Sequence, residues 1–201
     1  MVASSSRLMH GLSLLLIIAA LGLFGHSAWI EAKAWLAQVL IGRAWSESQT
    51  TGHPVRPWAW ADTWPVARLS VPRLGLERMV LAGVSGRTLA FGPGWAEQSA
   101  KPGEAGRTLL AGHRDTHFRF LAELVDGDRI VLQTANGEKR RYRVVVESVI
   151  DEDAVWLMGP DATDELLLVT CYPFDSPIPG GSQRYLVRAE PVPASVGNSG
   201  G

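Results

Sequence analysis

The chain has 201 residues, of which 46% are hydrophobic and 19% charged, and its formal net charge is −1 at pH 7. This length suits one ordinary domain with a core of its own, and the scattered, balanced charges argue against nucleic-acid binding. A single cysteine, Cys171, excludes an intrachain disulfide and cannot form a zinc site by itself. Cys171 is therefore a core residue, a reactive thiol or an intermolecular link.

The N-terminal stretch is apolar enough to cross a membrane. No Asp, Glu, Lys or Arg occurs between Arg7 and Glu31, and residues 12–24 read LSLLLIIAALGLF. Because about 20 apolar residues span the hydrocarbon core of a bilayer, residues 1–30 are predicted to form an uncleaved membrane anchor. A cleaved signal peptide is the alternative, although no convincing cleavage site follows the apolar run. The flanking basic residues do not settle the orientation of the anchor.

Residues 31–61 are expected to contain an amphipathic helix and a linker. Apolar residues recur at helical spacing along residues 28–45, and tryptophan is favoured at a membrane interface. The polar sequence SESQTTGHP at residues 46–54 breaks this pattern and is predicted to be the linker. Three tryptophans follow among prolines at residues 57–65. Their rings are expected to pack on the next domain, because an exposed tryptophan cluster would be costly.

Residues 62–190 carry short β-like runs separated by Gly and Pro. The runs are ARLSVP, RMVLAG, RTLLAG, RIVLQT, KRRYRVVVESVI, ELLLVTC and QRYLVRAE. The pair Asn136-Gly137 predicts a hairpin, and two brief helices are expected at residues 85–92 and 117–124, the second with Phe118, Leu121 and Leu124 on one face. Many strands with few helices predict a mainly β barrel or sandwich. The tail at residues 191–201 is predicted to be disordered.

The ends of three predicted strands carry side chains that could act together. A reactive cysteine needs a base or a cation nearby, and the candidates are His113, at the end of RTLLAGH, and Arg184 and Arg188 in QRYLVRAE. A Cys–His pair with a cationic oxyanion donor can catalyse acyl transfer. His113 and His117 are four residues apart, so a metal pair is the alternative for these histidines.

The segments GHRDTHFRFLAEL, GDRIVLQTANGEKRRYRV, LLLVTCYP and RYLVRAE resemble, in this order, the signature segments of the sortases. The family motif L-x-T-C is matched by residues 168–171, its Gly-His pair by Gly112 and His113, and its arginine by Arg184. The resemblance implies a closed eight-stranded β-barrel with two or three short helices, following an N-terminal transmembrane helix. It implies a cysteine transpeptidase with His113, Cys171 and Arg184 as catalytic residues. No cofactor and no metal are expected, since no clustered acidic loop indicates calcium.

The resemblance also implies partners and a location. The substrate would be a secreted protein with a C-terminal LPXTG-like sorting signal, cleaved between Thr and Gly and transferred to an amine. The catalytic domain would lie outside the cytoplasm, on the periplasmic side of a bacterial membrane. The tryptophan-rich sequence PWAWADTWPVARLSVP is similar to that of the sortase subgroup of Gram-negative bacteria.

Other classes fit the residues less well. The cysteine transpeptidases that cross-link peptidoglycan through D-amino acids have Gly before the cysteine and Arg two residues after it, whereas this chain has Thr170 and Pro173. A papain-like protease would have its cysteine before its histidine, but His113 precedes Cys171. A non-catalytic, membrane-tethered β-barrel that binds a partner remains the alternative.

Within each pair of candidates the sequence favours one residue. If the strands of ELLLVTC and QRYLVRAE form an antiparallel pair, Arg184 lies beside Cys171, and Arg188 lies roughly 13 Å further along at about 3.3 Å per residue. Arg188 is therefore expected to be structural or solvated. His113 directly ends a strand and is expected to be the acid/base, whereas His117 begins the helix at residues 117–124 and is expected to face solvent.

Overall fold

The computed structural model describes residues 2–153, 163–176 and 180–193. The chain divides into two compact units, Met1–Val39 and Leu40–Gly201. The first unit consists of most of helix α1, Val2–Thr51. This helix is long and apolar enough to cross a membrane, and its leucines and isoleucines between Leu14 and Leu21 are exposed to between 55% and 66%. The predicted N-terminal apolar helix is therefore present.

Helix α1 ends later than the sequence predicts. Residues 46–51, expected to belong to the linker, form its last turns. Their hydroxyl groups donate hydrogen bonds to the carbonyl oxygens four residues earlier, which supplies the polar run with partners inside the helix. In the second unit, Ile41 and Trp45 of this helix are buried, and the Arg68 guanidinium lies 5.9 Å from the centre of the Trp45 ring. The polar composition of residues 46–51 gave no indication that the helix continues through them.

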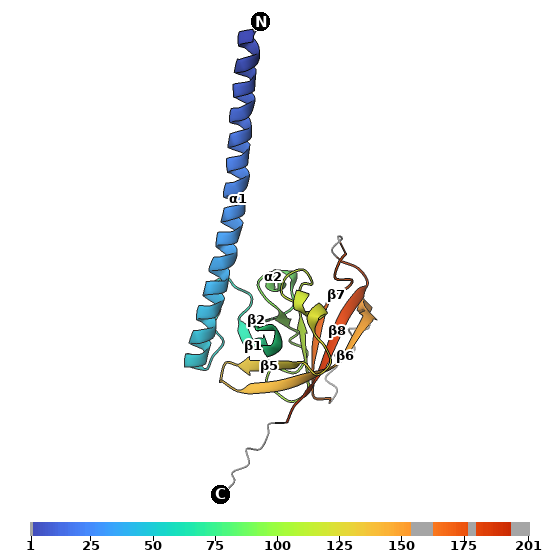
Figure 1. The fold of residues 1–201 in the computed structure, drawn as a ribbon. Helices are drawn as coiled ribbons and strands as arrows, with labels where there is room; N and C mark the ends of the chain where they lie inside the picture. Colours follow the sequence, from blue (N-terminus) through green and yellow to red (C-terminus); the bar gives the residue numbers. More distant parts are fainter. Residues whose placement is uncertain (1, 154–162, 177–179, 194–201) are drawn as a thin grey trace. The chain divides into compact units, whose positions relative to one another are not determined.

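Eight strands close into a barrel in the order β1-β2-β3-β4-β7-β8-β6-β5 (Figure 1). This confirms the predicted mainly β, closed eight-stranded barrel. The strands are β1 Pro65–Val71, β2 Leu76–Ala82, β3 Gly94–Trp95, β4 Arg107–Ala111, β5 Arg129–Thr134, β6 Lys139–Asp151, β7 Glu165–Cys171 and β8 Gln183–Pro191. All runs predicted as strands are strands. Strand β3 was not predicted, because two residues beside a proline show no alternation.

Among the described residues, three short helices connect the strands. They are the 3₁₀ helix η1, Pro72–Leu74, the α-helix α2, Gly86–Leu89, and the 3₁₀ helix η2, Arg119–Glu123. Both of the helices predicted from the sequence are present but shorter. Ser85 caps α2, since its hydroxyl oxygen accepts a hydrogen bond from the Thr88 N–H.

The barrel interior is filled by the alternating apolar residues of the strands. In β1 every second side chain is buried, as the period of a strand requires. The predicted apolar face of Phe118, Leu121 and Leu124 packs into the same core. The predicted hairpin joins β5 and β6, and Gly137 adopts the positive φ of 87° that its turn position needs. Local patterns thus determine most of the core.

The tryptophan-rich segment packs only in part. Trp58 contacts the Phe91 ring edge-on, with 5.2 Å between the ring centres, but Trp60 is 84% exposed. The expectation that all three rings pack on the domain is therefore wrong for Trp60. Of the tail predicted to be disordered, residues 191–193 are described, with Pro191 ending β8, and residues 194–201 lie outside the described residues.

Candidate active site

Strands β4, β7 and β8 lie side by side and determine the geometry around Cys171. Strand β7 pairs in parallel with β4 and antiparallel with β8. Leu166 and Leu168 of β7 point into the barrel core, whereas Leu167 and Val169 belong to a separate apolar cluster on the outward face. Because side chains alternate along a strand, Cys171 continues the outward row.

Cys171 is directly opposite Arg184. The two residues are partners in the register of β7 and β8, as the predicted antiparallel pairing requires. Residues in such pairs have Cα atoms about 4.5–5.5 Å apart. Cys171 is half-buried and its thiol is free. A partly accessible thiol beside an arginine is a suitable arrangement for a nucleophile.

His113 follows the end of β4, on the other side of β7. The last register pair of these strands joins Ala111 to Val169, and the Gly112 N–H then donates to the Val169 carbonyl oxygen at 3.1 Å. The buried Thr170 hydroxyl donates to the Gly112 carbonyl oxygen at 2.7 Å. Continuing the register by two residues beyond Ala111 and Val169 places exposed His113 beside Cys171. The three predicted site residues therefore meet at one end of three neighbouring strands.

The Arg184 guanidinium is held by several acceptors. Its Nη2 lies 2.6 Å from a carboxylate oxygen of Glu152, and its Nη1 donates to the carbonyl oxygens of Gly181 and Gln183 at 2.7 and 2.9 Å. The Arg184 side chain is 17% exposed and that of Glu152 is 59% exposed. The pairing of Glu152 with Arg184 was not predicted from the sequence, since this contact depends on how β6 pairs with β8.

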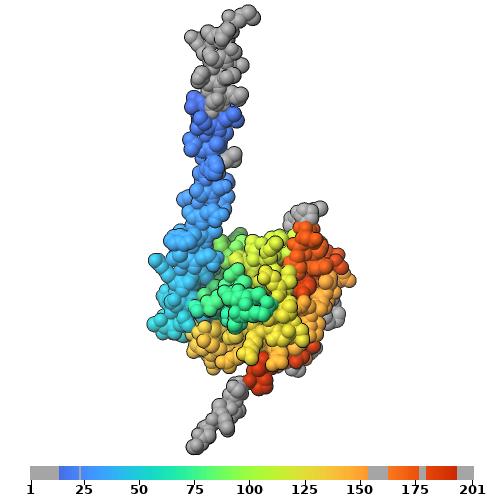
Figure 2. All heavy atoms as spheres, in the orientation of Figure 1, coloured from blue at the N-terminus to red at the C-terminus, as the bar shows by residue number. Residues whose placement is uncertain are grey.

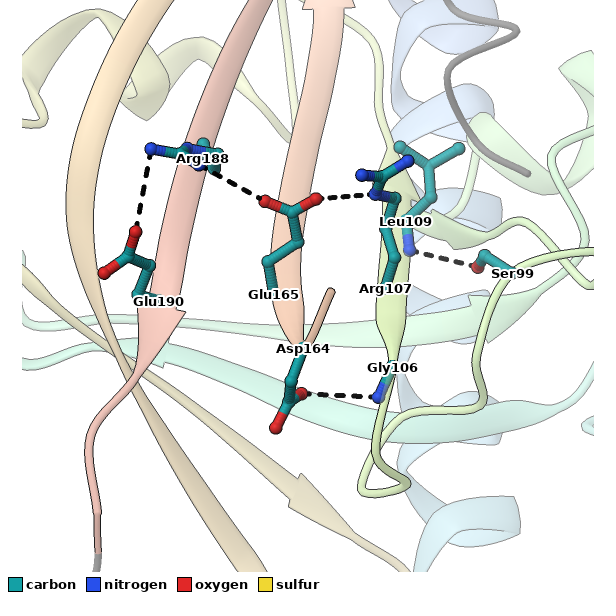
Figure 3. A network of polar contacts seen from close by, with 8 residues as sticks. All are labelled: Ser99, Gly106, Arg107, Leu109, Asp164, Glu165, Arg188 and Glu190. Atoms are coloured by element: carbon teal, nitrogen blue, oxygen red, sulfur yellow. Dashed lines mark hydrogen bonds and ion pairs between the residues drawn. The ribbon is translucent and has the colours of Figure 1, made fainter. Parts of the chain in front are cut away.

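Arg188 lies at the opposite end of the β7–β8 pair. Figure 3 shows Glu165, the first residue of β7, between Arg107 and Arg188. The Glu165 carboxylate is 2.6 Å from Arg107 and 3.8 Å from Arg188, which also pairs with Glu190 at 3.6 Å. The Glu165 side chain is 4% exposed. Arg188 therefore belongs to an ion-pair network that joins β4, β7 and β8, as expected for a structural residue.

His117 differs from its expected position. It is half-buried rather than solvent-facing, and its Nε2 lies 3.4 Å from the Ala90 carbonyl oxygen. The pKa of the His117 imidazole is lowered, chiefly by burial, and the hydrogen bond to the Ala90 carbonyl opposes this effect. Among the described residues, no group of three or more His, Cys, Asp or Glu side chains could hold a metal ion.

Arg114 is a further residue that sequence analysis missed. Its side chain is 4% exposed, although it directly follows exposed His113. It donates to both carboxylate oxygens of Asp115 and to two carbonyl oxygens that lie beyond Cys171 in the chain. The pKa of Asp115 is lowered, chiefly because Arg114 donates a hydrogen bond to its carboxylate. An arginine between two polar residues gave no sign of burial in the sequence.

Gly112 is required by the packing of Phe118 behind His113. A Cβ atom at position 112 would lie 2.7 Å from Cγ of the Phe118 ring, which is fully buried. Gly112→Ala is therefore expected to destabilise the protein by about 1–3 kcal/mol, the usual cost of overpacking a core. Thermal unfolding of the full chain in detergent measures this, with Gly86→Ala as control because its added Cβ meets nothing within 4 Å. An unchanged Tm for Gly112→Ala would contradict the packing described here.

The sequence signature described as the Sortase domain matches residues 69–192. The chain belongs to the sortase family. The sequence of this sortase is 34% identical to that of Sortase D of Bacillus subtilis (strain 168) over 125 aligned residues, which cover 62% of each chain. It is 28% identical to Sortase A of Bacillus anthracis over 131 aligned residues, which cover 63% of this chain and 60% of that relative. This sortase thus spans about three fifths of the length of the curated relatives that it matches.

Solved structures agree with the fold of this sortase. Sortase A from Corynebacterium diphtheriae superposes with a TM-score of 0.60 at 28% sequence identity, over 69% of this chain and 66% of that chain. Residues 69–192, which match the family, contain β4, β7 and β8. The candidate site of this sortase therefore lies within the part of the barrel that the family shares.

Proposed function

We propose that this protein is a membrane-anchored cysteine transpeptidase that cleaves an LPXTG-like sorting signal between Thr and Gly. Its substrate is a secreted protein with that signal near its C-terminus, and an amine accepts the cleaved chain. Membership in the sortase family supports this reaction class. The observation that carries the proposal is the meeting of Cys171, Arg184 and the end of β4 on one outward face.

The proposed reaction proceeds in two acyl transfers. The Cys171 thiolate attacks the threonine carbonyl carbon, and Arg184 stabilises the oxyanion or positions the substrate backbone. The C–N bond to glycine then breaks while His113 donates a proton to the leaving amine, and a thioester remains on Cys171. The incoming amine attacks this thioester, with His113 now taking a proton. The C–S bond then breaks, the new amide is released, and Cys171 leaves as the thiolate with the proton on His113, as at the start of the cycle.

Before this reaction the Arg184 guanidinium would exchange some of its present partners for the substrate. Glu152, its charged partner, is largely exposed, so solvent weakens the ion pair. The contacts with Gly181 and Gln183 hold the guanidinium at the start of β8, next to Cys171. Such a pre-placed planar donor suits a developing oxyanion better than a flexible lysine would.

The anchor belongs to the same proposal. The apolar part of α1 would hold the chain in the membrane, with the N-terminus in the cytoplasm and the barrel on the periplasmic side. A solitary thiol suits an oxidising compartment, because no second cysteine can trap it as an intrachain disulfide. The tryptophan-rich segment at residues 57–65 supports assignment to the sortase subgroup of Gram-negative bacteria.

A peptide assay tests this function. The full chain in detergent is incubated with an LPXTG-type peptide and an amine, and the products are identified by mass spectrometry. Cleavage between Thr and Gly with formation of the new amide is expected. A thiol-directed reagent provides a second measurement, because an inert buried cysteine in a binding module would not react selectively at neutral pH. Absence of both peptide turnover and thiol reactivity would favour the non-catalytic alternative.

Alanine variants of Arg184 and Arg188, both on β8, test which arginine takes part in the reaction. Arg184→Ala is expected to lower turnover by about two orders of magnitude or more, in line with losing an oxyanion donor. Arg184→Lys should recover little, because a point charge cannot replace the planar fork. Arg188→Ala should keep kcat/KM within several-fold of wild type, since Arg188 lies in the network at the far end of β8 (Figure 3). Greater damage from Arg188→Ala in peptide turnover would contradict this assignment.

A further inference from the structure

We propose that Arg114 is a positioning residue for this active site, because its guanidinium holds the chain that follows Cys171 against the chain that carries His113. This inference rests on the proposed transpeptidase function. Arg114 does not act on the substrate itself. Its role is to keep two segments, which come from different strands, in one fixed relative position.

The contacts of Arg114 span the site. Its Nη1 donates to the Pro173 carbonyl oxygen at 2.5 Å, and its Nη2 donates to the Ser176 carbonyl oxygen at 3.0 Å. Its Nε donates to an Asp115 carboxylate oxygen at 2.9 Å. The acceptors at Pro173 and Ser176 lie two and five residues after Cys171, and the donor lies one residue after His113. One planar group thus bridges the two segments.

The burial of Arg114 shows that these contacts are integral to the packing. A guanidinium that is 4% exposed would be strongly disfavoured without partners, so each acceptor offsets part of the cost of removing the charge from water. The pKa of Arg114 is raised, chiefly by its hydrogen bond to Asp115 and against the opposing effect of burial. The group therefore stays charged, and it lies close enough to the thiol to interact with it electrostatically.

The segment after Cys171 needs such a restraint because it leaves the barrel there. Strand β7 ends at Cys171, and Tyr172 makes one further ladder-type bond, from its N–H to the Gln183 carbonyl oxygen. The Ser176 N–H bonds back to the Pro173 carbonyl oxygen at 3.4 Å, so these residues form a turn. In Figure 2 the red-orange surface of the C-terminal strands and their connection lies beside yellow-green and yellow surface from the middle of the chain, in keeping with the contacts of Arg114. Arg114 therefore binds the carbonyl oxygens of the first and last residues of this turn, Pro173 and Ser176.

Misplacement of reacting groups by about 1 Å can lower a catalysed rate by about two orders of magnitude. Loosening the turn would therefore lower kcat while leaving the binding of the substrate elsewhere largely unchanged. This differs from a purely structural role, which would lower the Tm without selectively lowering kcat in the folded enzyme.

The test compares Arg114→Gln and Arg114→Lys with wild type, all as full chains in detergent. Hydrogen exchange followed by mass spectrometry measures the amides of residues 172–176, and peptide turnover gives kcat and KM. For Arg114→Gln we expect about tenfold or faster exchange in this segment and a kcat lowered about tenfold or more, with KM within about threefold. Arg114→Lys should recover only a minor part of each loss, since a lysine cannot bond both carbonyls in the plane of a guanidinium.

Arg73→Gln is the matched control. Like Arg114, Arg73 binds one carboxylate with two nitrogens, that of buried Asp128 at 2.6 and 2.7 Å, and it donates to a carbonyl oxygen, that of Glu123. It joins η1 to the region around η2 and β5, and its hydrogen bonds within the described residues are to Glu123 and Asp128, away from the site. Arg73→Gln should lower the Tm and leave kcat unchanged. Asp115→Asn, which keeps both carbonyl contacts of Arg114, should also leave kcat within about twofold.

The outcomes separate the positioning role from the proposed function. Unchanged exchange at residues 172–176, or unchanged kcat, in folded Arg114→Gln would overturn the positioning role, and so would an equal loss of kcat in Arg73→Gln. If Arg114→Gln fails to fold, Arg114→Lys decides by the same two measurements. Wild-type protein that turns over no sorting peptide would contradict the proposed function, whereas the exchange measurement would still decide whether Arg114 restrains the turn.

Discussion

Cys171→Ala is expected to abolish both cleavage and transpeptidation of an LPXTG-type peptide while leaving the barrel folded. No other thiol exists in the chain to form the thioester. The fold should survive because Cys171 is at the end of β7, half-buried and outside the apolar core. Peptide turnover measures the loss, and thermal unfolding verifies the fold.

The positive control for this prediction is a covalent adduct on the wild-type enzyme. Intact-protein mass spectrometry should detect the acyl fragment of the peptide on wild type and not on Cys171→Ala. If the alanine variant retains more than a trace of turnover, the thiol mechanism is wrong.

His113→Ala should have the second-largest effect, with kcat/KM lowered by about 10²–10⁴-fold, the usual contribution of a positioned acid/base. His113 continues β4 beside Cys171, where the contacts of Gly112 with Val169 and Thr170 fix the backbone. His117→Ala should lower kcat/KM only slightly. Turnover of the LPXTG-type peptide by the two variants compares these histidines directly.

Because His117 is half-buried, the stability of the His117→Ala variant must be considered when the two histidines are compared. Its ring packs near the Ala90 carbonyl, so His117→Ala is expected to lower the Tm as well. Kinetics must therefore be measured at a temperature at which both variants are folded. A larger kcat/KM loss for His117→Ala than for His113→Ala under those conditions would reverse the assignment of the acid/base.

Features determined by short-range patterns could be predicted from the sequence. The alternation in ELLLVTC and QRYLVRAE predicted β7 and β8, and an antiparallel pairing of the two strands predicted that Arg184 would be the partner of Cys171. The hairpin at Asn136-Gly137 and the apolar face of Phe118, Leu121 and Leu124 followed in the same way. In each case the residues that decide the structure are near one another in the chain.

Features that depend on distant segments could not be predicted. The Glu152–Arg184 pair requires the register of β6 with β8, and the Arg114 contacts require the turn after Cys171 to fold back onto the chain after β4. Strand β3 is held by β2 and β4 rather than by any pattern of its own. The helical state of residues 46–51 depends on hydroxyl-to-carbonyl bonds that their polar composition does not indicate.

The parallel pairing of β4 with β7 has a consequence for protein engineering. Since both strands end at the same rim and β8 begins there, Cys171 and Arg184 are attached to the edge of the barrel, and His113 lies two residues beyond the end of β4. At the other end, the ion pairs of Glu165 with Arg107 and Arg188 resist sliding of these strands. A change of substrate preference is therefore best sought in rim loops other than residues 112–117 and 172–176, because Arg114 joins these two segments beside the reactive groups.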